Sequence, residues 1–195
     1  MSKKDIKRKV MRISLLGDSG VGKTCIINKY LYDKFSETHN SSIGLEKNEK
    51  KLKMNDGNEL KVIIWDTAGQ ERFKSMSTNT VKGAQGIVLV FDIAKKSTFD
   101  NLPKWIKEIK EIKDNIPIVI FGNKCDLVEE IDVDNDEAMN FAKDNDMEYF
   151  ETSAKKNINI ENGFKNIIDK AYETAQEEDG LDLKKPQQPK KKGRC

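Results

Sequence analysis

The sequence predicts an α/β domain with a six-stranded, mostly parallel sheet, one antiparallel hairpin edge and helices on both faces. First, two dense apolar runs, 87–93 and 116–121, are typical of strands that are buried on both faces of a sheet. Second, strand-like and helix-like segments alternate along the chain, which favours parallel strands joined by helical crossovers. Third, strand-like segments 49–54 and 60–65 are joined by Asn-Asp-Gly-Asn, a sequence typical of hairpin turns.

The remaining elements follow from local patterns. Apolar residues within 97–114 recur at spacings of three and four, which predicts a largely helical amphipathic segment, with Pro103 tolerated only near its first turn. The chain before the hairpin predicts a strand at 10–16 and a helix at 23–31. The last expected elements are a helix at 136–145, a strand at 148–150 and a helix from about 160 whose pattern fails after 175.

Length and charge predict one domain followed by a tail. The chain has 195 residues, which suits a single domain, here residues 1–178. Residues 179–195 are rich in lysine and contain two prolines, which predicts a disordered basic tail. Six of the 35 basic residues lie in 184–195, which has no acidic residue. The rest of the chain therefore has 29 basic and 33 acidic residues. A basic tail on an acidic body argues against a nucleic-acid-binding face on the globular part.

The cysteines and the apolar runs indicate where the protein works. Cys25, Cys125 and Cys195 are far apart and lack the spacing of metal ligands, which favours a reduced, cytoplasmic chain. No apolar run approaches the roughly 18 residues that a membrane span needs. We therefore expect an intracellular protein that does not cross a membrane.

A phosphate-binding loop is the most specific motif. Residues 17–24, GDSGVGKT, match G-x-x-x-x-G-K-[ST] and stand between the first strand and the first helix, as this motif requires. Glycines let consecutive N–H groups surround a phosphate, and the helix N-terminus adds positive potential. Lys23 would reach the terminal phosphates, and Thr24 would supply a hydroxyl to Mg²⁺. The alternative is a glycine-rich turn without a ligand, which this placement disfavours.

Three further polar loops follow strands and are expected at the same sheet edge. The string WDTAGQE places Asp66 at a strand end, where a carboxylate can hold Mg²⁺ through water, and Gln70 is suited to orienting an attacking water. The string GNKCDL places Asp126 where a carboxylate can accept from the ring N–H and the amine of guanine. The string ETSAK follows the last strand. Each string alone could be an ordinary loop, but their shared edge favours a nucleotide site.

Together these motifs resemble those of the Ras superfamily of small GTPases, and within it the Rab family, which regulates vesicle traffic. The strings WDTAGQERF, GNKCDL and ETSAK carry the resemblance, which extends over about 12–175. It implies the P-loop NTPase G-domain fold and slow GTP hydrolysis, with GTP or GDP and Mg²⁺ bound. The nucleotide-binding residues that it implies are Asp18, Ser19, Gly20, Val21, Gly22, Lys23, Thr24, Cys25, Phe35, Ser42, Gly69, Asn123, Lys124, Asp126, Ser153, Ala154 and Lys155.

The resemblance also implies individual roles. Phe35 would pack on the guanine ring, while Asn123 and Asp126 would read the base. Lys23 and Gln70 would be the catalytic residues. The metal ligands would be Thr24, Ser42 and Asp66, and the second switch would contain Asp66, Gly69 and Gln70.

The chain departs from the family pattern in both switch regions. Ser42 stands where the family usually has threonine, so the hydroxyl and N–H contacts remain possible. The missing methyl lowers side-chain rigidity, so we expect the closed loop to be less populated. Lys47, Thr80 and Val81 stand where Rab proteins usually carry aromatic residues of the effector surface. We therefore expect a more polar surface and transfer no particular Rab partner to this chain.

Cys195 is a candidate for lipid attachment. It follows the basic run KKKGR, where Rab chains more often have paired cysteines, and the three further residues of a C-a-a-X signal are absent from the sequence. Prenylation beside the basic run would satisfy the two-signal requirement for stable anchoring, which predicts attachment to the cytosolic face of intracellular membranes. The alternative is a soluble lysine-rich tail with an incidental thiol.

The resemblance implies a monomer that works with an exchange factor, a GTPase-activating protein, effectors and a prenyl-carrier protein of the GDI type. Two other functions stay open from the residues. One is a nucleotide-binding switch scaffold with negligible hydrolysis, which Ser42 allows and the intact Gly69 and Gln70 disfavour. The other is a phosphate-loop kinase, which the Asn-Lys-Cys-Asp string and the lack of an arginine-rich lid segment disfavour.

Overall fold

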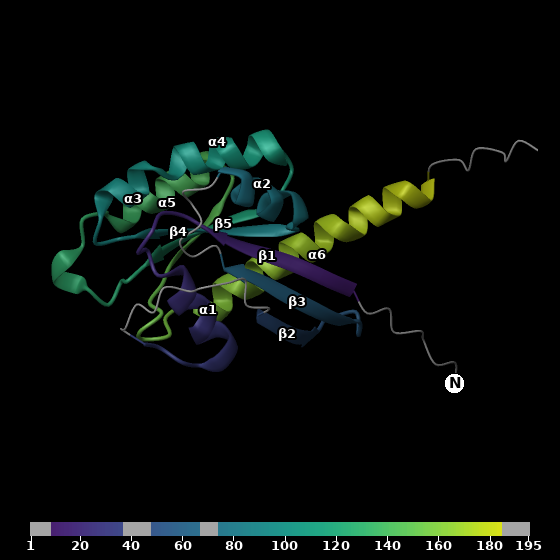
Figure 1. Cartoon of the computed structure of the whole chain (residues 1–195), viewed down its shortest axis with the longest axis horizontal. Coiled ribbons are helices and arrows are strands. Elements are labelled where there is room, and N and C mark those ends of the chain that lie inside the picture. The colour runs from purple at the N-terminus through teal and green to yellow at the C-terminus, as the bar shows by residue number, and fades with distance from the viewer. Residues whose placement is uncertain (1–8, 37–47, 67–73, 185–195) are drawn as a thin grey trace, which may run out of the picture.

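The computed structural model describes residues 9–36, 48–66 and 74–184, and it confirms the expected fold class (Figure 1). Within these residues, six strands form one sheet in the order β2-β3-β1-β4-β5-β6, with β2 and β3 antiparallel and the other neighbours parallel. The strands are β1 (Lys9–Leu16), β2 (Asn48–Lys53), β3 (Glu59–Asp66), β4 (Gly86–Asp92), β5 (Ile118–Asn123) and β6 (Glu148–Glu151). The helices are α1 (Lys23–Tyr32), α2 (Lys74–Gly83), α3 (Lys96–Asp100), α4 (Leu102–Ile112), α5 (Asn135–Asp144), α6 (Ile160–Lys184) and the 3₁₀ helix η1 (Val128–Glu130).

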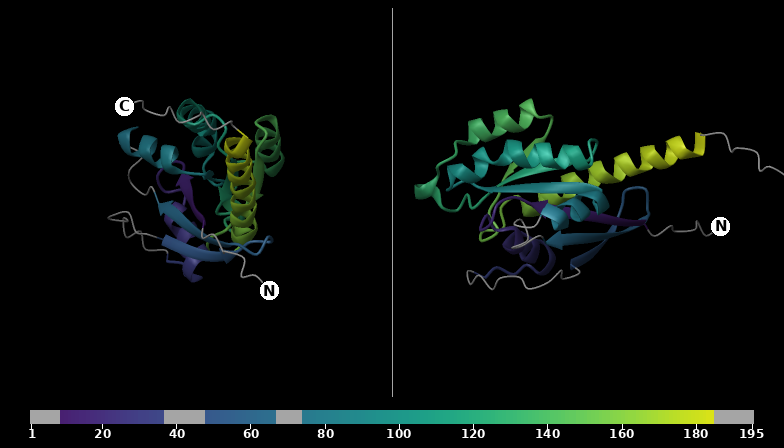
Figure 2. Two further views of the ribbon diagram at one scale, coloured as in Figure 1. Left: turned by 90° about the vertical axis from the view of Figure 1, so that its right-hand side faces the viewer. Right: turned by 45° about the horizontal axis from the view of Figure 1, so that its top comes forward.

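The sheet lies between two layers of helices because its central strands direct apolar side chains to both faces. In β4, Val88 packs in one core, and its neighbours Ile87 and Leu89 pack in the other. Helices α1 and α6 cover the face that carries Val88, and α2 to α5 cover the face that carries Ile87 and Leu89 (Figures 1 and 2). Every residue of β4 and β5 is buried, as the dense apolar runs predict.

The segment predicted as one amphipathic helix at 97–114 is two helices in the structure. Helix α3 ends at Asp100 and α4 begins at Leu102, with Asn101 between them. Pro103 lies in the first turn of α4. In a continuous helix its ring would clash with the carbonyl four residues earlier, so the chain breaks just before it.

The sequence pattern does not predict α2 or η1. Helix α2 has the sequence KSMSTNTVKG, in which only Met76 and Val81 are apolar, so it shows no helical period. Val81 is nevertheless buried in the core on the α4 side of the sheet. Its packing, rather than a local pattern, accounts for a helix at this position.

Helix α6 continues to Lys184, so the first residues of the predicted tail 179–195 are helical. The segment EEDGLDLK consists mostly of residues that tolerate a helix, and one internal glycine costs only about 1 kcal/mol. Among the described residues, no helix combines the length and the apolarity that crossing a bilayer requires.

The parallel pairing positions the site. Because β1, β3, β4, β5 and β6 run in the same direction, their carboxyl ends share one edge of the sheet. The loops that follow β1, β5 and β6 therefore meet there, as does the end of β3.

Candidate functional site

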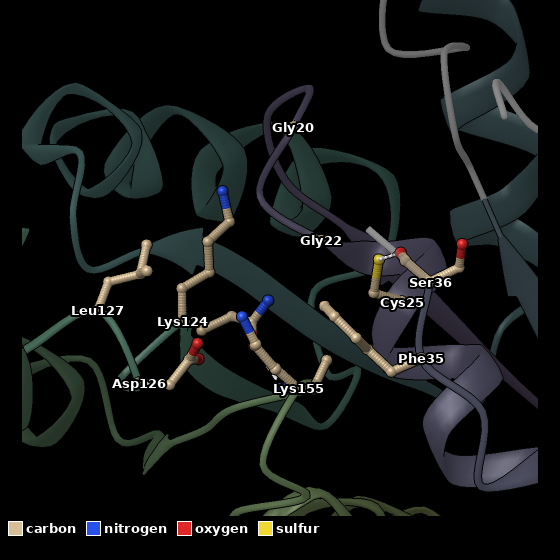
Figure 3. Close-up of a pocket in the computed structure, with 11 residues that line it drawn as sticks. Gly20, Gly22, Cys25, Phe35, Ser36, Lys124, Asp126, Leu127 and Lys155 are labelled. Atoms are coloured by element: carbon tan, nitrogen blue, oxygen red, sulfur yellow. Dashed lines mark hydrogen bonds between the residues drawn. The ribbon is translucent and has the colours of Figure 1, made fainter. Parts of the chain in front are cut away.

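A pocket of about 200 Å³ opens at this edge of the sheet (Figure 3). In Figure 3, Lys124, Asp126 and Leu127 come from the loop after β5 and lie across the pocket from the α1 side. Phe35 and Cys25 form that opposite side. The lining residues are Gly20, Gly22, Cys25, Phe35, Ser36, Asn123, Lys124, Asp126, Leu127, Ala154 and Lys155.

The loop between β1 and α1 needs glycine at two close approaches. Gly17 has a φ of +132°, and a Cβ on it would lie 2.0 Å from the carbonyl oxygen of Val90. Gly22 has a φ of +97°, and its Cβ would lie 2.4 Å from Nδ2 of Asn123. Any side chain at either position would force the loop away from β4 or from the loop after β5. The two glycines therefore let the loop wrap tightly at the sheet edge.

Lys23 begins α1, but its side chain folds back over the preceding loop. Its Nζ donates to the carbonyl oxygens of Gly17 and Asp18, each at 2.7 Å. The side chain is buried, with only 5% of the residue exposed. A buried ammonium group beside a helix N-terminus creates the positive potential that an anion requires.

Thr24 connects the same loop to β3. Its Oγ1 donates to Oδ2 of Asp66 at 2.7 Å, and Asp66 is buried at the end of β3. A hydroxyl and a carboxylate side by side are oxygen ligands of the kind that Mg²⁺ prefers, so the pair fits two of the three predicted metal ligands. Among the described residues, no three His, Cys, Asp or Glu side chains are grouped so that they could hold a metal ion.

Asn123 joins three loops on the opposite side of the pocket. Its Nδ2 donates to the carbonyl oxygen of Val21 at 2.8 Å, and its Oδ1 accepts from the backbone N–H of Ala154 at 3.3 Å. Only 2% of the residue is exposed. One buried amide thus fixes the loops after β1, β5 and β6 relative to one another.

Asp126 is oriented by the loop after β6. The hydroxyl of Ser153 donates to Oδ1 of Asp126 at 2.6 Å, and it accepts from the backbone N–H of Lys156 at 2.9 Å. Lys124 adopts a φ of +73° and forms an ion pair with Asp92 at 2.5 Å. The carboxylate of Asp126 therefore has a fixed direction at the pocket wall.

Two half-buried thiols lie near the pocket. Burial raises the pKa of the Cys25 thiol above its usual 9.0, the nearby Lys124 lowers it, and Asp66 raises it further. Burial likewise raises the pKa of Cys125, and the charges of Glu151 and Asp126 add to the effect. Both thiols are thus protonated at neutral pH and add no negative charge to the site.

Comparison with known proteins decides the family. The model of the Ras family matches residues 12–173. The chain belongs to the Ras family. It is a Rab-like small GTPase, 42% identical over 156 residues to Ras-related protein Rab-8A of Bos taurus, covering 80% of this chain and 75% of the relative. It is also 38% identical over 159 residues to Ras-related protein Rab-13 of Rattus norvegicus, covering 81% and 78%.

In this Rab-like GTPase, most of the described residues predicted to bind the nucleotide line the pocket. The prediction missed Ser36 and Leu127, although each adjoins a predicted residue or motif. Thr24 and Ser153 bond Asp66 and Asp126 instead of lining the pocket. Asp18, Ser19, Val21 and Lys23 of the phosphate-binding loop do not line the pocket either. Among them Ser19 is exposed, and Val21 and Lys23 are buried. Contact of any of these residues with a nucleotide stays a prediction.

Several predicted residues lie outside the described part of the GTPase. They are Ser42, Gly69, Gln70 and Cys195, and Lys47 of the expected effector surface lies outside it too. Of the other two positions expected on that surface, Thr80 is partly exposed, but Val81 is buried and cannot present its side chain to a partner.

The GTPase also has contacts with the phosphate-binding loop that were not predicted. Asn101 and Trp105, from the junction of α3 and α4, donate to the carboxylate of Asp18. The apolar period of α4 placed Trp105 in the core, and it is in fact packed against the core on that face. The N–H of an indole that is shielded from water usually needs a hydrogen-bond acceptor. This need was the one feature of Trp105 from which a polar partner could have been predicted.

Proposed function

We propose that this Rab-like GTPase binds GTP and GDP with Mg²⁺, hydrolyses GTP, and acts as a membrane-associated switch in vesicle traffic. The main support is that three loops converge on one pocket. The phosphate loop contributes Gly20 and Gly22, and the loops after β5 and β6 contribute Asp126 and Lys155. A nucleotide has phosphates at one end and a base at the other, which matches the arrangement of these loops.

The orientation of Asp126 supports guanine as the base. Ser153 holds one carboxylate oxygen at 2.6 Å, which fixes the direction of the group. Guanine presents a ring N–H and an exocyclic amine that a single carboxylate can accept together. Adenine presents no such pair of donors, so Asp126 would select GTP over ATP.

Thr24, Ser42 and Asp66 would hold Mg²⁺. Bound Mg²⁺ would neutralise charge on the phosphate oxygens. Oγ1 of Thr24 and Oδ2 of Asp66 lie 2.7 Å apart, so the fold brings two candidate oxygen ligands to one place. This proximity supports the assignment of the pair.

Hydrolysis would require a water in line with the γ-phosphate, and we assign its orientation to Gln70. Lys23 and the N–H groups of the phosphate loop would stabilise the negative charge that develops in the transition state. Residues 37–47 contain no arginine that could act in cis. Turnover would therefore be slow until an activating protein supplies one.

Membrane association would depend on the segment after α6. A prenyl group on Cys195 and the adjacent basic run would act together, with each basic residue adding about 1 kcal/mol at an anionic surface. The partners proposed from the family are an exchange factor, an activating protein, effectors and a GDI-type carrier. The protein would act as a monomer on the cytosolic face of intracellular membranes.

Nucleotide selectivity and hydrolysis test the proposal in sequence. Nucleotide-free protein should bind a fluorescent GTP analogue with Mg²⁺ at least about 100-fold more tightly than the matching ATP analogue, since a polar group left unpaired is costly. Equal binding would contradict guanine selection. A single-turnover assay should then release phosphate. Tight GTP binding with no phosphate release over many hours would instead support the scaffold alternative.

A further inference from the structure

The phosphate-binding loop carries a negative charge of its own. Asp18 lies two residues after β1, in the loop that we propose surrounds the phosphates. A free carboxylate beside a polyphosphate repels it, and repulsion between partly buried charges is only weakly screened by salt. The loop can retain a nucleotide only if this carboxylate is held away from it.

The structure shows what holds it. Asn101 Nδ2 donates to Oδ2 of Asp18 at 2.7 Å, and Trp105 Nε1 donates to Oδ1 at 2.9 Å. Both donors come from the junction of α3 and α4, outside the predicted nucleotide motifs. Lys23 meanwhile donates to the backbone oxygen of the same aspartate. Asp18 is thus held through its main chain by Lys23 and through its side chain by α4.

The start of α4 is built around this contact. Asn101 is the N-cap of α4, a position where an asparagine side chain normally accepts from the first turn of the helix. Here it makes no capping hydrogen bond, and its amide donates to Asp18 instead. The carboxylate also lies at the helix N-terminus, where the helix dipole favours negative charge. The break between α3 and α4 therefore places the amide of Asn101 beside Asp18 of the phosphate loop.

We propose that Asn101 and Trp105 are positioning residues for nucleotide binding. They hold the carboxylate of Asp18 against α4, which keeps its negative charge away from the phosphates. The inference rests on the proposed nucleotide site. Removing either donor would release a negative charge beside the phosphates and shorten the lifetime of the bound nucleotide, without unfolding the domain.

Release of bound GDP measures this effect. Trp105→Phe keeps an aromatic ring and removes the N–H, and Asn101→Ala removes the other donor. Each should accelerate GDP release about tenfold, the effect of losing one hydrogen bond to a charged group. Asn162→Ala is the matched control. Asn162 is exposed in the first turn of α6, and its side-chain amide donates to Asn159 just before that helix. It should leave GDP release unchanged.

The decisive measurement repeats both substitutions in the Asp18→Ala background. There the carboxylate is gone, so Trp105→Phe and Asn101→Ala should cause no further acceleration. Equal acceleration in both backgrounds would show that the residues act through packing, and would overturn the proposal. Release within about twofold of the unsubstituted protein for both single variants, with unchanged circular dichroism, would overturn it as well.

Two further outcomes stay interpretable. If Trp105→Phe does not fold, Asn101→Ala gives the same comparison alone, because Asn101 is exposed and has no core role. If the unsubstituted protein retains no guanine nucleotide, the proposed function fails and this inference fails with it. If it retains GDP normally but the two backgrounds respond alike, only the positioning role fails.

Discussion

The polar contacts of Lys23, on the phosphate side of the pocket, differ in kind from those on the base side. On the base side, formed by Asn123, Asp126 and Ser153, polar groups bond one another across loops that are far apart in the sequence. On the phosphate side, formed by residues 17–24, Lys23 bonds carbonyl oxygens of its own loop. The first kind of contact stabilises the fold as well as the site, whereas the second can be exchanged for ligand oxygens. Substitutions on the two sides should therefore separate affinity from stability.

The largest effect is expected on the phosphate side. Lys23→Met should weaken GTP binding on the order of a thousandfold, because it removes charge-assisted hydrogen bonds worth about 1.5–3 kcal/mol each. Binding of guanosine, which lacks phosphates, should not change. Titration with both ligands, together with thermal melting, measures this. A large drop in the melting temperature together with the loss of affinity would show that Lys23 also stabilises the fold, and the distinction between the two sides would fail.

Asn123→Ala should lower affinity and stability together. It leaves the Val21 carbonyl and the Ala154 N–H without their partner, which should reduce GTP affinity about a hundredfold and the free energy of unfolding by about 2 kcal/mol. Asn115→Ala, at an exposed position after α4, is the control and should change neither. Urea denaturation and nucleotide titration test the pair. Lost affinity with unchanged stability would show that the contacts of Asn123, like those of Lys23, do not stabilise the fold.

Ser153→Ala should have a smaller effect, confined to the base. The Asp126 carboxylate would keep its charge but lose the donor that orients it, so GTP affinity should fall about tenfold while ATP affinity stays the same. The exposed Ser97 provides the control substitution Ser97→Ala. Competition between GTP and ATP reports the ratio directly. A parallel loss for both nucleotides would mean that Ser153 supports the loop rather than base selection.

The smallest effect concerns the two thiols. Both should react slowly with iodoacetamide at neutral pH and faster as the pH rises above 9, because each pKa is raised and only the thiolate reacts. GDP should slow alkylation of Cys25 severalfold, because Cys25 lines the pocket, and should leave Cys125 unaffected. Peptide mapping by mass spectrometry distinguishes them. Equal protection of both thiols would point to a change in the whole domain.

The base side and the phosphate loop could be predicted from the sequence because their polar residues and glycines lie in short, contiguous motifs. GDSGVGKT specifies its glycines through local backbone geometry, and the structure adds the reason for Gly22, the close approach of Asn123. The strands were predictable because burial on both faces leaves dense apolar runs. These features need no knowledge of distant contacts.

The parts that were not predicted depend on contacts between distant residues. Asn101 and Trp105 lie more than eighty positions from Asp18, and nothing in the local period of α4 identifies a polar partner for them. The break at Asn101 was hidden because apolar spacing continues on both sides of it. Helix α2 has too few apolar residues to show a period and is held by the packing of Val81. Here tertiary contacts outweigh local propensity.

Helix α6 separates the pocket from the chain that follows the helix. Its 25 residues correspond to a rod about 37 Å long, which starts beside the loop after β6 and runs beyond the opposite end of the sheet (Figure 1). The chain therefore leaves α6 at the end of the molecule opposite the pocket, and Cys195 lies eleven positions further along the sequence. A protein that docks at the pocket edge of the sheet would therefore not contact the far end of α6.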